Sequence, residues 1–291
     1  HYPLRRQRQM CIRDRVNIGV QSADQMVQMA QLVESLGYES VWTFEHVVIP
    51  IDYESKYPYN KSGNMGAAPE TNFVDPLIAL SAVAASTKTI RLATGVNILS
   101  QVNPIYMAKQ AASLDFISDG RFMLGVGIGW LREEFEALGV PFEHRGARFD
   151  DYVAGMRKIW SGDVVEHESE FISWKGFKSY PLPIQNPFPV VMGGVKGKIF
   201  KRTAQLGNGW FAPTGDPGEL KEHMTLLGEE CDAIGRDLSE IEITCMWPGK
   251  GGEEFLGELE AVGVGRVVIP IMGQGDPVER LTTIAEEFIK S

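Results

Sequence analysis

Short apolar segments alternate with helical segments eight times between residue 16 and the C-terminus, and this rhythm constrains the fold more than any other feature. The first strand is expected over 16–20. The helix after it begins in a capping box, Ser22 with Gln25, and ends at Gly37. The other strands are expected over 39–44, 89–96, the apolar part of 120–130, 189–192, 209–212, 241–246 and 265–270. Eight such units predict an α/β fold, a parallel (β/α)8 or TIM barrel.

One span interrupts the alternation after the fourth strand. Residues 131–138 and 148–160 have helical periodicity, and 164–174 has the pattern of a β-hairpin, so we expect an excursion from the barrel that extends to about residue 186. A second irregular segment, rich in Tyr, Pro, Gly and Asn, runs from 45 to about 72. A loop of this length in a compact domain is usually functional, and we expect it to act as a lid. Residues 16–291 are predicted to form a single domain.

The first fifteen residues do not share this periodicity. Residues 1–15 contain five arginines against the single acid Asp14, and they lack the apolar centre of a signal peptide. The segment 10–15 resembles a translated sequencing adapter. We therefore expect residues 1–15 to be non-native or disordered, to replace the native start of the chain, and to have no function.

Charge and cysteine content exclude several classes of protein. The net charge of −10 argues against a nucleic-acid partner, since proteins that bind polyphosphates usually present a basic surface. No apolar run reaches the roughly 18 residues that a membrane-spanning helix needs. The three cysteines have no C-x-x-C spacing and cannot all pair, which favours reduced thiols and a cytoplasmic protein.

The fourth predicted strand ends in glycines at alternate positions, 125, 127 and 129. Without a Cβ, the backbone there can lie directly against a flat ligand. The spacing is not the G-x-G-x-x-G of a dinucleotide fold, because the third glycine comes one residue early. The alternative is that these glycines serve packing alone.

In a barrel of this kind the active site lies at the C-terminal ends of the strands. Glu45 and His46 follow the second strand, and His46 is the one histidine expected at a strand end. An imidazole can transfer a proton near neutral pH, and the adjacent Glu45 could orient it. The alternative is that His46 only caps a turn. A metal-dependent hydrolase needs several His and Asp ligands at strand ends, so no metal is expected.

Glycine, tryptophan and methionine dominate the other strand ends, which suits a flat aromatic cofactor. After the fifth strand, Gly193 and Gly194 lead into a helix start that carries Lys196 and Lys198. Backbone N–H groups at a helix N-terminus favour an anion, and lysines there oppose the helix dipole, so helix stability does not explain them. The pattern indicates a phosphate site. The alternative is a solvated basic helix face.

Several of these motifs resemble the bacterial luciferase-like monooxygenase superfamily. They are Trp42-x-x-Glu-His46, Asp75-Pro76, Thr94-Gly-Val96, the run 119–130, Gly193-Gly194 and Gly209-Trp-Phe211. The likeness extends from about residue 16 to the C-terminus. The stretch 127–135 is most similar to the branch that depends on the deazaflavin coenzyme F420. Two departures are the altered N-terminus and the short connection after the first strand at Gln21-Ser22.

The resemblance implies a role for each motif. His46 would lie near the reactive carbon of the cofactor. Thr94, Gly95 and Val96 would form a bulge, often with a non-proline cis peptide, that supports the cofactor ring. Behind the ring would lie Gly127, Ile128 and Gly129, and Gly193 and Gly194 would hold its phosphate end.

We therefore expect an F420-dependent oxidoreductase that transfers a hydride between the deazaflavin and an organic substrate. The alternative within the family is an FMN-dependent monooxygenase, since a fold does not fix a function. A third possibility is a barrel that binds a phosphorylated metabolite without redox chemistry, through residues 273–275. The expected partners are a small-molecule substrate and a second copy of the chain in a homodimer, without nucleic acid or a membrane.

Overall fold

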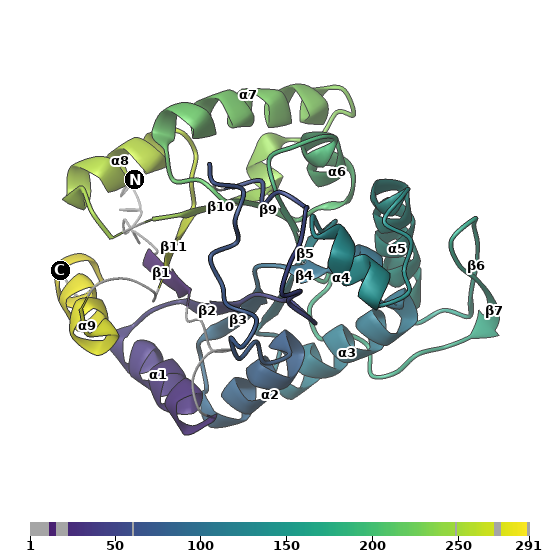
Figure 1. Ribbon diagram of the computed structural model, residues 1–291, viewed down its shortest axis with the longest axis horizontal. Coiled ribbons are helices and arrows are strands. Elements are labelled where there is room, and N and C mark those ends of the chain that lie inside the picture. The colour runs from purple at the N-terminus through teal and green to yellow at the C-terminus, as the bar shows by residue number, and fades with distance from the viewer. Residues whose placement is uncertain (1–11, 16–22, 60, 248, 271–274, 290–291) are drawn as a thin grey trace, which may run out of the picture.

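Eight parallel strands form a closed barrel in the computed structural model of the chain (Figure 1). The structure describes residues 12–15, 23–59, 61–247, 249–270 and 275–289. The barrel strands are β1 (Ile12–Arg15), β2 (Ser40–Thr43), β3 (Arg91–Thr94), β5 (Phe122–Gly127), β8 (Val190–Gly193), β9 (Gly209–Ala212), β10 (Glu242–Met246) and β11 (Arg266–Pro270). Pairing of β3 with β5 closes the sheet, and the two-residue strand β4 (Asn97–Ile98) adds to β5. The predicted (β/α)8 fold is confirmed.

Helices cover the outside of this barrel (Figure 1). They are α1 (Ala23–Leu36), α2 (Pro76–Ser86), α3 (Pro104–Ile117), α4 (Arg132–Ala137), α5 (Arg145–Ile159), α6 (Ile199–Leu206), α7 (Pro217–Asp232), α8 (Gly252–Ala261) and α9 (Pro277–Phe288), with 3-10 turns at Leu99–Gln101 and Leu238–Glu240. Three helix starts have the expected cap followed by proline, at Asp75, Asn103 and Asp276, whose side chains accept backbone N–H groups of the first turn.

The first strand differs from the prediction. Strand β1 consists of Ile12–Arg15 and pairs with β11 and β2. It therefore lies inside the segment that was expected to stand outside the fold. The predicted strand 16–20 is outside the described residues. The prediction relied on apolar character, whereas the structure uses four residues with one apolar member, which no periodicity rule would select.

The excursion after the fourth unit has the predicted parts. It contains α4, α5 and an antiparallel hairpin of β6 (Val165–Glu168) and β7 (Ser173–Phe177). Figure 1 shows this hairpin projecting from the side of the barrel beside α5. The excursion therefore leaves the barrel mouth through α4 and returns at β8, so that α4 and the start of α5 lie next to the strand ends.

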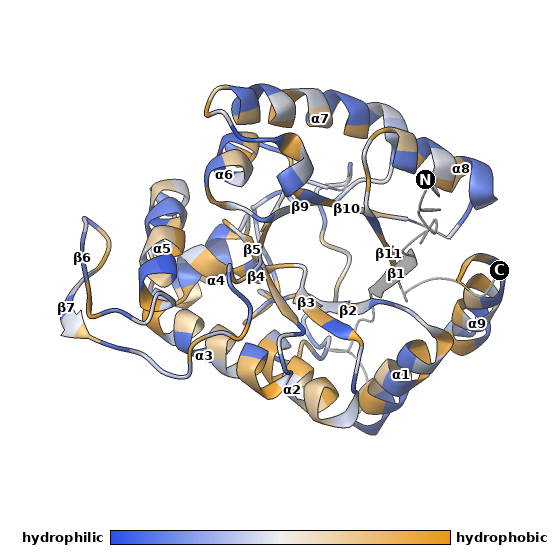
Figure 2. Cartoon of the chain, turned by 180° about the vertical axis from the view of Figure 1, so that it is seen from behind, coloured by the Kyte–Doolittle hydropathy of each residue, from blue (hydrophilic) through white to orange (hydrophobic). Residues whose placement is uncertain are grey.

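Two apolar layers hold the barrel together. One fills the space between sheet and helices, and a smaller one, with Trp42, Phe211 and Met123 among its members, fills the barrel interior. Helix α2 has no charged residue and is drawn mostly in apolar colours in Figure 2; one of its outward residues, Ile78, is 68% exposed.

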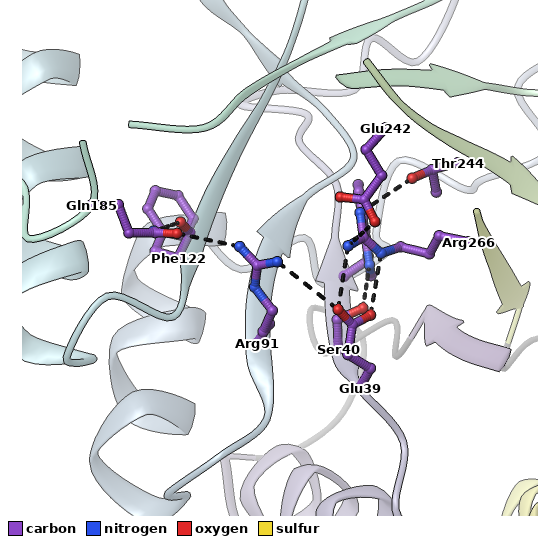
Figure 3. Close-up of polar contacts among 9 residues, drawn as sticks. Glu39, Ser40, Arg91, Phe122, Gln185, Glu242, Thr244 and Arg266 are labelled. Carbon is purple, nitrogen blue, oxygen red and sulfur yellow. Dashed lines mark hydrogen bonds and ion pairs between the residues drawn. The ribbon is translucent and has the colours of Figure 1, made fainter. Parts of the chain in front are cut away.

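An ion-pair network fills the N-terminal end of the barrel (Figure 3). The guanidinium of Arg266 is buried and lies 3.3 Å from each carboxylate oxygen of Glu39. It also pairs with Glu242, and Arg91 extends the network at 3.9 Å from Glu39. A buried cation between two carboxylates thus closes the end opposite the predicted site.

Candidate active site

A cavity of about 530 Å³ opens at the C-terminal ends of the strands. It is walled by the ends of β3, β5, β8, β9 and β10 and by residues 44–59. Ten of the predicted site residues line it: Glu45, His46, Gly95, Val96, Gly127, Ile128, Gly129, Gly193, Gly194 and Lys196. The structure therefore brings together residues from four separate motifs in one cavity.

The floor of the cavity contains a non-proline cis peptide bond between Gly95 and Val96, which confirms that expectation. The side chain of Val96 fills the space in front of the neighbouring strands. A Cβ added to Gly127 would lie 2.8 Å from it, and one added to Gly193 would lie 2.6 Å from it. Gly127 and Gly193 are therefore required by the position of Val96 in the bulge. Packing thus explains these two glycines in part.

Thr94 has a different position from the one predicted. Its side chain is fully buried outside the cavity wall, donates to Gly125 O at 2.7 Å and accepts from Gly125 N at 2.9 Å. A Cβ on Gly125 would lie 1.8 Å from the Thr94 carbonyl oxygen. The Thr94 hydroxyl makes both of these hydrogen bonds to Gly125, so it is directed away from the cavity. Thr94 therefore fastens the bulge to β5.

His46 is held by a carboxylate that the sequence analysis did not single out. Its Nδ1 lies 3.0 Å from Oε2 of Glu134, a buried residue in the first turn of α4. The other oxygen of Glu134 accepts the backbone N–H of Val47 at 2.6 Å. A carboxylate at Nδ1 assigns the proton to that nitrogen, so Nε2 is left for the cavity that His46 lines. The orienting role expected of Glu45 belongs to Glu134.

Glu45 instead supports the bulge from the side of β2. Its Oε2 accepts the backbone N–H of Ile98 at 2.5 Å, and its carboxyl also receives a side-chain hydrogen bond from Asn97. Burial, with smaller contributions from the charges of Glu134 and Asp75, raises the pKa of Glu45 to about 7. The cavity thus contains a buried carboxyl that changes its protonation state near neutral pH.

The lid loop, residues 45–72, folds over the cavity and contains no helix or strand within its described part. Helix α4 also holds the middle of the lid loop, because Oε1 of Glu133 accepts the backbone N–H groups of Glu54 at 2.7 Å and Ser55 at 3.1 Å. Further along the loop, a Cβ on Gly194 would lie 3.2 Å from the Tyr59 hydroxyl. The lid loop therefore spans the cavity from His46 to the end of β8.

Basic side chains gather at the side of the cavity formed by α5 and α6. Arg145, Lys196 and Arg202 line it there. Arg202 is paired with Asp150 at 2.5 Å, whereas Arg145 donates hydrogen bonds to the carbonyl oxygens of Gly129 and Phe142. Burial, and next the charge of Arg132, lowers the pKa of Arg145. A guanidinium that donates to carbonyl oxygens and stacks on the ring of Phe142 suits an anionic group of a ligand.

Lys198 does not belong to this set. Helix α6 begins at Ile199, after both lysines, and Lys198 is its exposed N-cap residue outside the cavity wall. The alternative of a solvated basic residue therefore holds for Lys198, whereas Lys196 is also exposed but lines the cavity. The other phosphate candidate, 273–275, lies outside the described residues except for Gly275.

These residues fit a flat cofactor with an anionic tail. The bulge offers a surface free of large side chains over the ends of β3, β5 and β8, and the basic side chains lie beyond it. Among the described residues no three His, Cys, Asp or Glu side chains are grouped as metal ligands. In the same part of the chain, no helix combines the length and the apolar character needed to cross a membrane.

The fold and the cavity define a barrel with a site large enough for a cofactor. Comparison of the sequence with known protein families identifies the family of this barrel. The model of the family described as luciferase-like monooxygenase matches residues 8–248, and the chain belongs to this family. It is 32% identical over 209 residues to the uncharacterized protein Rv0953c of Mycobacterium tuberculosis, covering 72% of this chain and 74% of that protein.

Two further proteins differ in cofactor. The F420-dependent glucose-6-phosphate dehydrogenase of Amycolatopsis mediterranei is 27% identical over 225 residues, covering 75% of this chain and 62% of that one. The oxygenating constituent of 3,6-diketocamphane monooxygenase from Pseudomonas putida, a type II Baeyer-Villiger monooxygenase in complex with FMN, superposes with a TM-score of 0.71 at 16% identity, covering 92% and 93% of the two chains. The family thus contains oxidoreductases with either cofactor.

Proposed function

We propose that this chain is an F420-dependent oxidoreductase that transfers a hydride between the deazaflavin and an organic substrate. The observation that carries the proposal is His46, fixed by Glu134 at the wall of a cavity whose floor is the Gly95–Val96 bulge. The F420-dependent relative supports this choice of cofactor.

The residues of the site have separate tasks in this reaction. When bound, the deazaflavin accepts or donates a hydride at the carbon that replaces N5 of a flavin. Oxidation of an alcohol to a carbonyl compound also releases one proton from the hydroxyl group. Nε2 of His46 accepts that proton, or returns it in the reverse direction, while Glu134 holds the ring and stabilises its charged form. Arg145 and Lys196 would hold the anionic tail.

The second candidate is an FMN-dependent monooxygenase of the same family. The observation that favours it is the FMN-containing structure with the same fold. The cavity floor is compatible with either ring, because a deazaflavin and a flavin share their flat shape.

Titration of the purified protein with each cofactor separates the candidates. We expect F420 to bind at least about tenfold more tightly than FMN, a difference of about 1.4 kcal/mol. Alcohol-dependent reduction of the bound deazaflavin, followed by its absorbance, tests the hydride transfer. Tighter binding of FMN, with consumption of oxygen by the reduced form, would favour the monooxygenase. Binding of neither would favour the phosphorylated-metabolite barrel.

We also retain as proposals a small-molecule substrate, a homodimer and a cytoplasmic location.

A further inference from the structure

Aromatic side chains surround His46 at the lid side of the cavity. The rings of Phe73 and Trp130 lie 5.7 and 6.1 Å from the imidazole, both edge-on. Tyr57 and Tyr53 extend this group, with ring centroids 5.2 and 5.8 Å from that of Trp130. We call Tyr53, Tyr57, Phe73 and Trp130 the aromatic wall. Tyr57 and Trp130 line the cavity itself.

The hydroxyl of Tyr53 and the carboxylate of Glu134, next to the rings, are engaged within the protein. The Tyr53 hydroxyl donates to Asn64 at 3.1 Å and accepts the Met65 N–H at 3.1 Å. Glu134 is occupied by His46 and by the start of the lid loop. This part of the cavity therefore offers a ligand the rings of Tyr57 and Trp130 together with His46.

Charge at this end disfavours an anionic substrate. Two buried carboxyl groups, Glu45 and Glu134, flank His46, and their mutual repulsion contributes to the raised pKa of Glu45. Of the cations that line the cavity, Arg202 is paired with Asp150 and Lys196 is exposed, whereas Arg145 donates to the carbonyl oxygen of Gly129 and stacks on the ring of Phe142. The remaining lysine of the wall, Lys56, is exposed on the lid loop, where water screens its charge. A phosphate next to His46 would therefore meet carboxylates and lose hydration.

We infer that the substrate is an uncharged alcohol or ketone that carries a flat or alicyclic ring. Its ring packs against Trp130 and Tyr57, and its oxygen lies at His46. Offset and edge-on contacts with aromatic rings at these spacings favour such a group, and a phosphorylated sugar has neither the apolar surface nor the charge for this end of the cavity. The oxygen function rests on the proposed hydride transfer; the ring preference rests on the aromatic wall alone.

The test measures binding rather than turnover. Acetophenone, as an uncharged aryl ketone, is titrated into the protein loaded with whichever of the two cofactors it binds, and saturation-transfer NMR gives its Kd. We expect Trp130→Ala and Tyr57→Ala each to raise the Kd about five- to tenfold. Tyr57→Phe keeps the ring and should stay within about twofold. Tyr106→Ala, which removes an exposed tyrosine of α3 outside the cavity, should leave the Kd unchanged.

Glucose 6-phosphate serves as the charged probe and should not displace acetophenone. Displacement by it, absence of acetophenone binding, or an unchanged Kd in Trp130→Ala and Tyr57→Ala would overturn the inference. A loss in Tyr57→Phe as large as in Tyr57→Ala would do the same, because it would assign recognition to the hydroxyl. Tighter binding of FMN than of F420 overturns the proposed function alone, since the acetophenone titration does not depend on turnover.

Discussion

Replacing Glu45 with glutamine should make the protein more stable at alkaline pH and leave it almost unchanged at acid pH. The carboxyl has a pKa of about 7 in the folded protein, compared with its ordinary value of 4.5, because it is buried next to Glu134. At pH values between 4.5 and about 7, the carboxyl of Glu45 is protonated in the folded protein and ionised in the unfolded chain. The free energy of unfolding therefore falls as the pH rises through this range.

The size of the expected change in the free energy of unfolding follows from the shift in the pKa of Glu45. A difference of about 2.5 pKa units corresponds to about 3 kcal/mol at 1.36 kcal/mol per unit. Glu45 is only 8% exposed, so solvent does not reduce this value much. Glutamine cannot ionise and can still accept the N–H of Ile98. The variant Glu45→Gln should exceed the parent by about 2–3 kcal/mol at pH 8.5 and differ by less than about 1 kcal/mol at pH 4.5.

Urea unfolding of both proteins at the two pH values measures this difference. The matched control is Glu222→Gln on the exposed side of α7, which should change the free energy of unfolding by less than about 0.5 kcal/mol at either pH. A Glu45→Gln variant that is destabilised equally at pH 4.5 and 8.5 would refute the reasoning, because it would show that folding does not shift the pKa of this carboxyl.

Five further variants and one measurement of mass test the site, the fold and the assembly. His46→Ala should reduce turnover by about 10²–10⁴ while cofactor affinity stays within a few-fold, and Glu134→Gln should reduce turnover less, both read from steady-state kinetics; near-parental turnover of His46→Ala would make it a structural residue. Lys196→Ala should weaken cofactor binding about tenfold at low salt and less at 0.5 M salt, whereas Lys198→Ala should have little effect in the same titration; equal losses would place both lysines at the anion. Arg266→Ala should lower the free energy of unfolding in urea by about 3 kcal/mol, because it removes the buried cation that Glu39 and Glu242 share, and a loss below about 1 kcal/mol would contradict that. Sedimentation velocity should give the mass of a dimer, and a monomer at all concentrations would refute the expected homodimer.

Much of the fold could be predicted because short local sequence patterns determine it. Apolar runs, capping residues such as Asp75 and Asn103, and the glycines around them determine where strands end and helices begin. The barrel topology then places every strand end at one face, so that His46 and Gly193 could be assigned to one site although they are far apart in the sequence.

The partners within the site could not be predicted in the same way. Glu45 is adjacent to His46 in sequence, but successive residues after a strand point in different directions, and Glu45 is directed to Ile98. The carboxylate that does reach His46 comes from 88 residues further along the chain. Its approach depends on how the short helix α4 packs over the end of β5, and α4 itself carried only a helical pattern in the sequence.

The network of Arg266, Glu39 and Glu242 has a consequence for the order of events at the opposite end (Figure 3). Because these side chains fill the N-terminal end of the barrel, ligands reach the floor of the cavity from the lid side. In the proposed arrangement the cofactor ring rests on the Gly95–Val96 bulge and the substrate packs against Trp130, between that ring and the lid loop. For the proposed reaction this arrangement predicts a compulsory order, with the cofactor binding before the substrate and the product leaving before the cofactor.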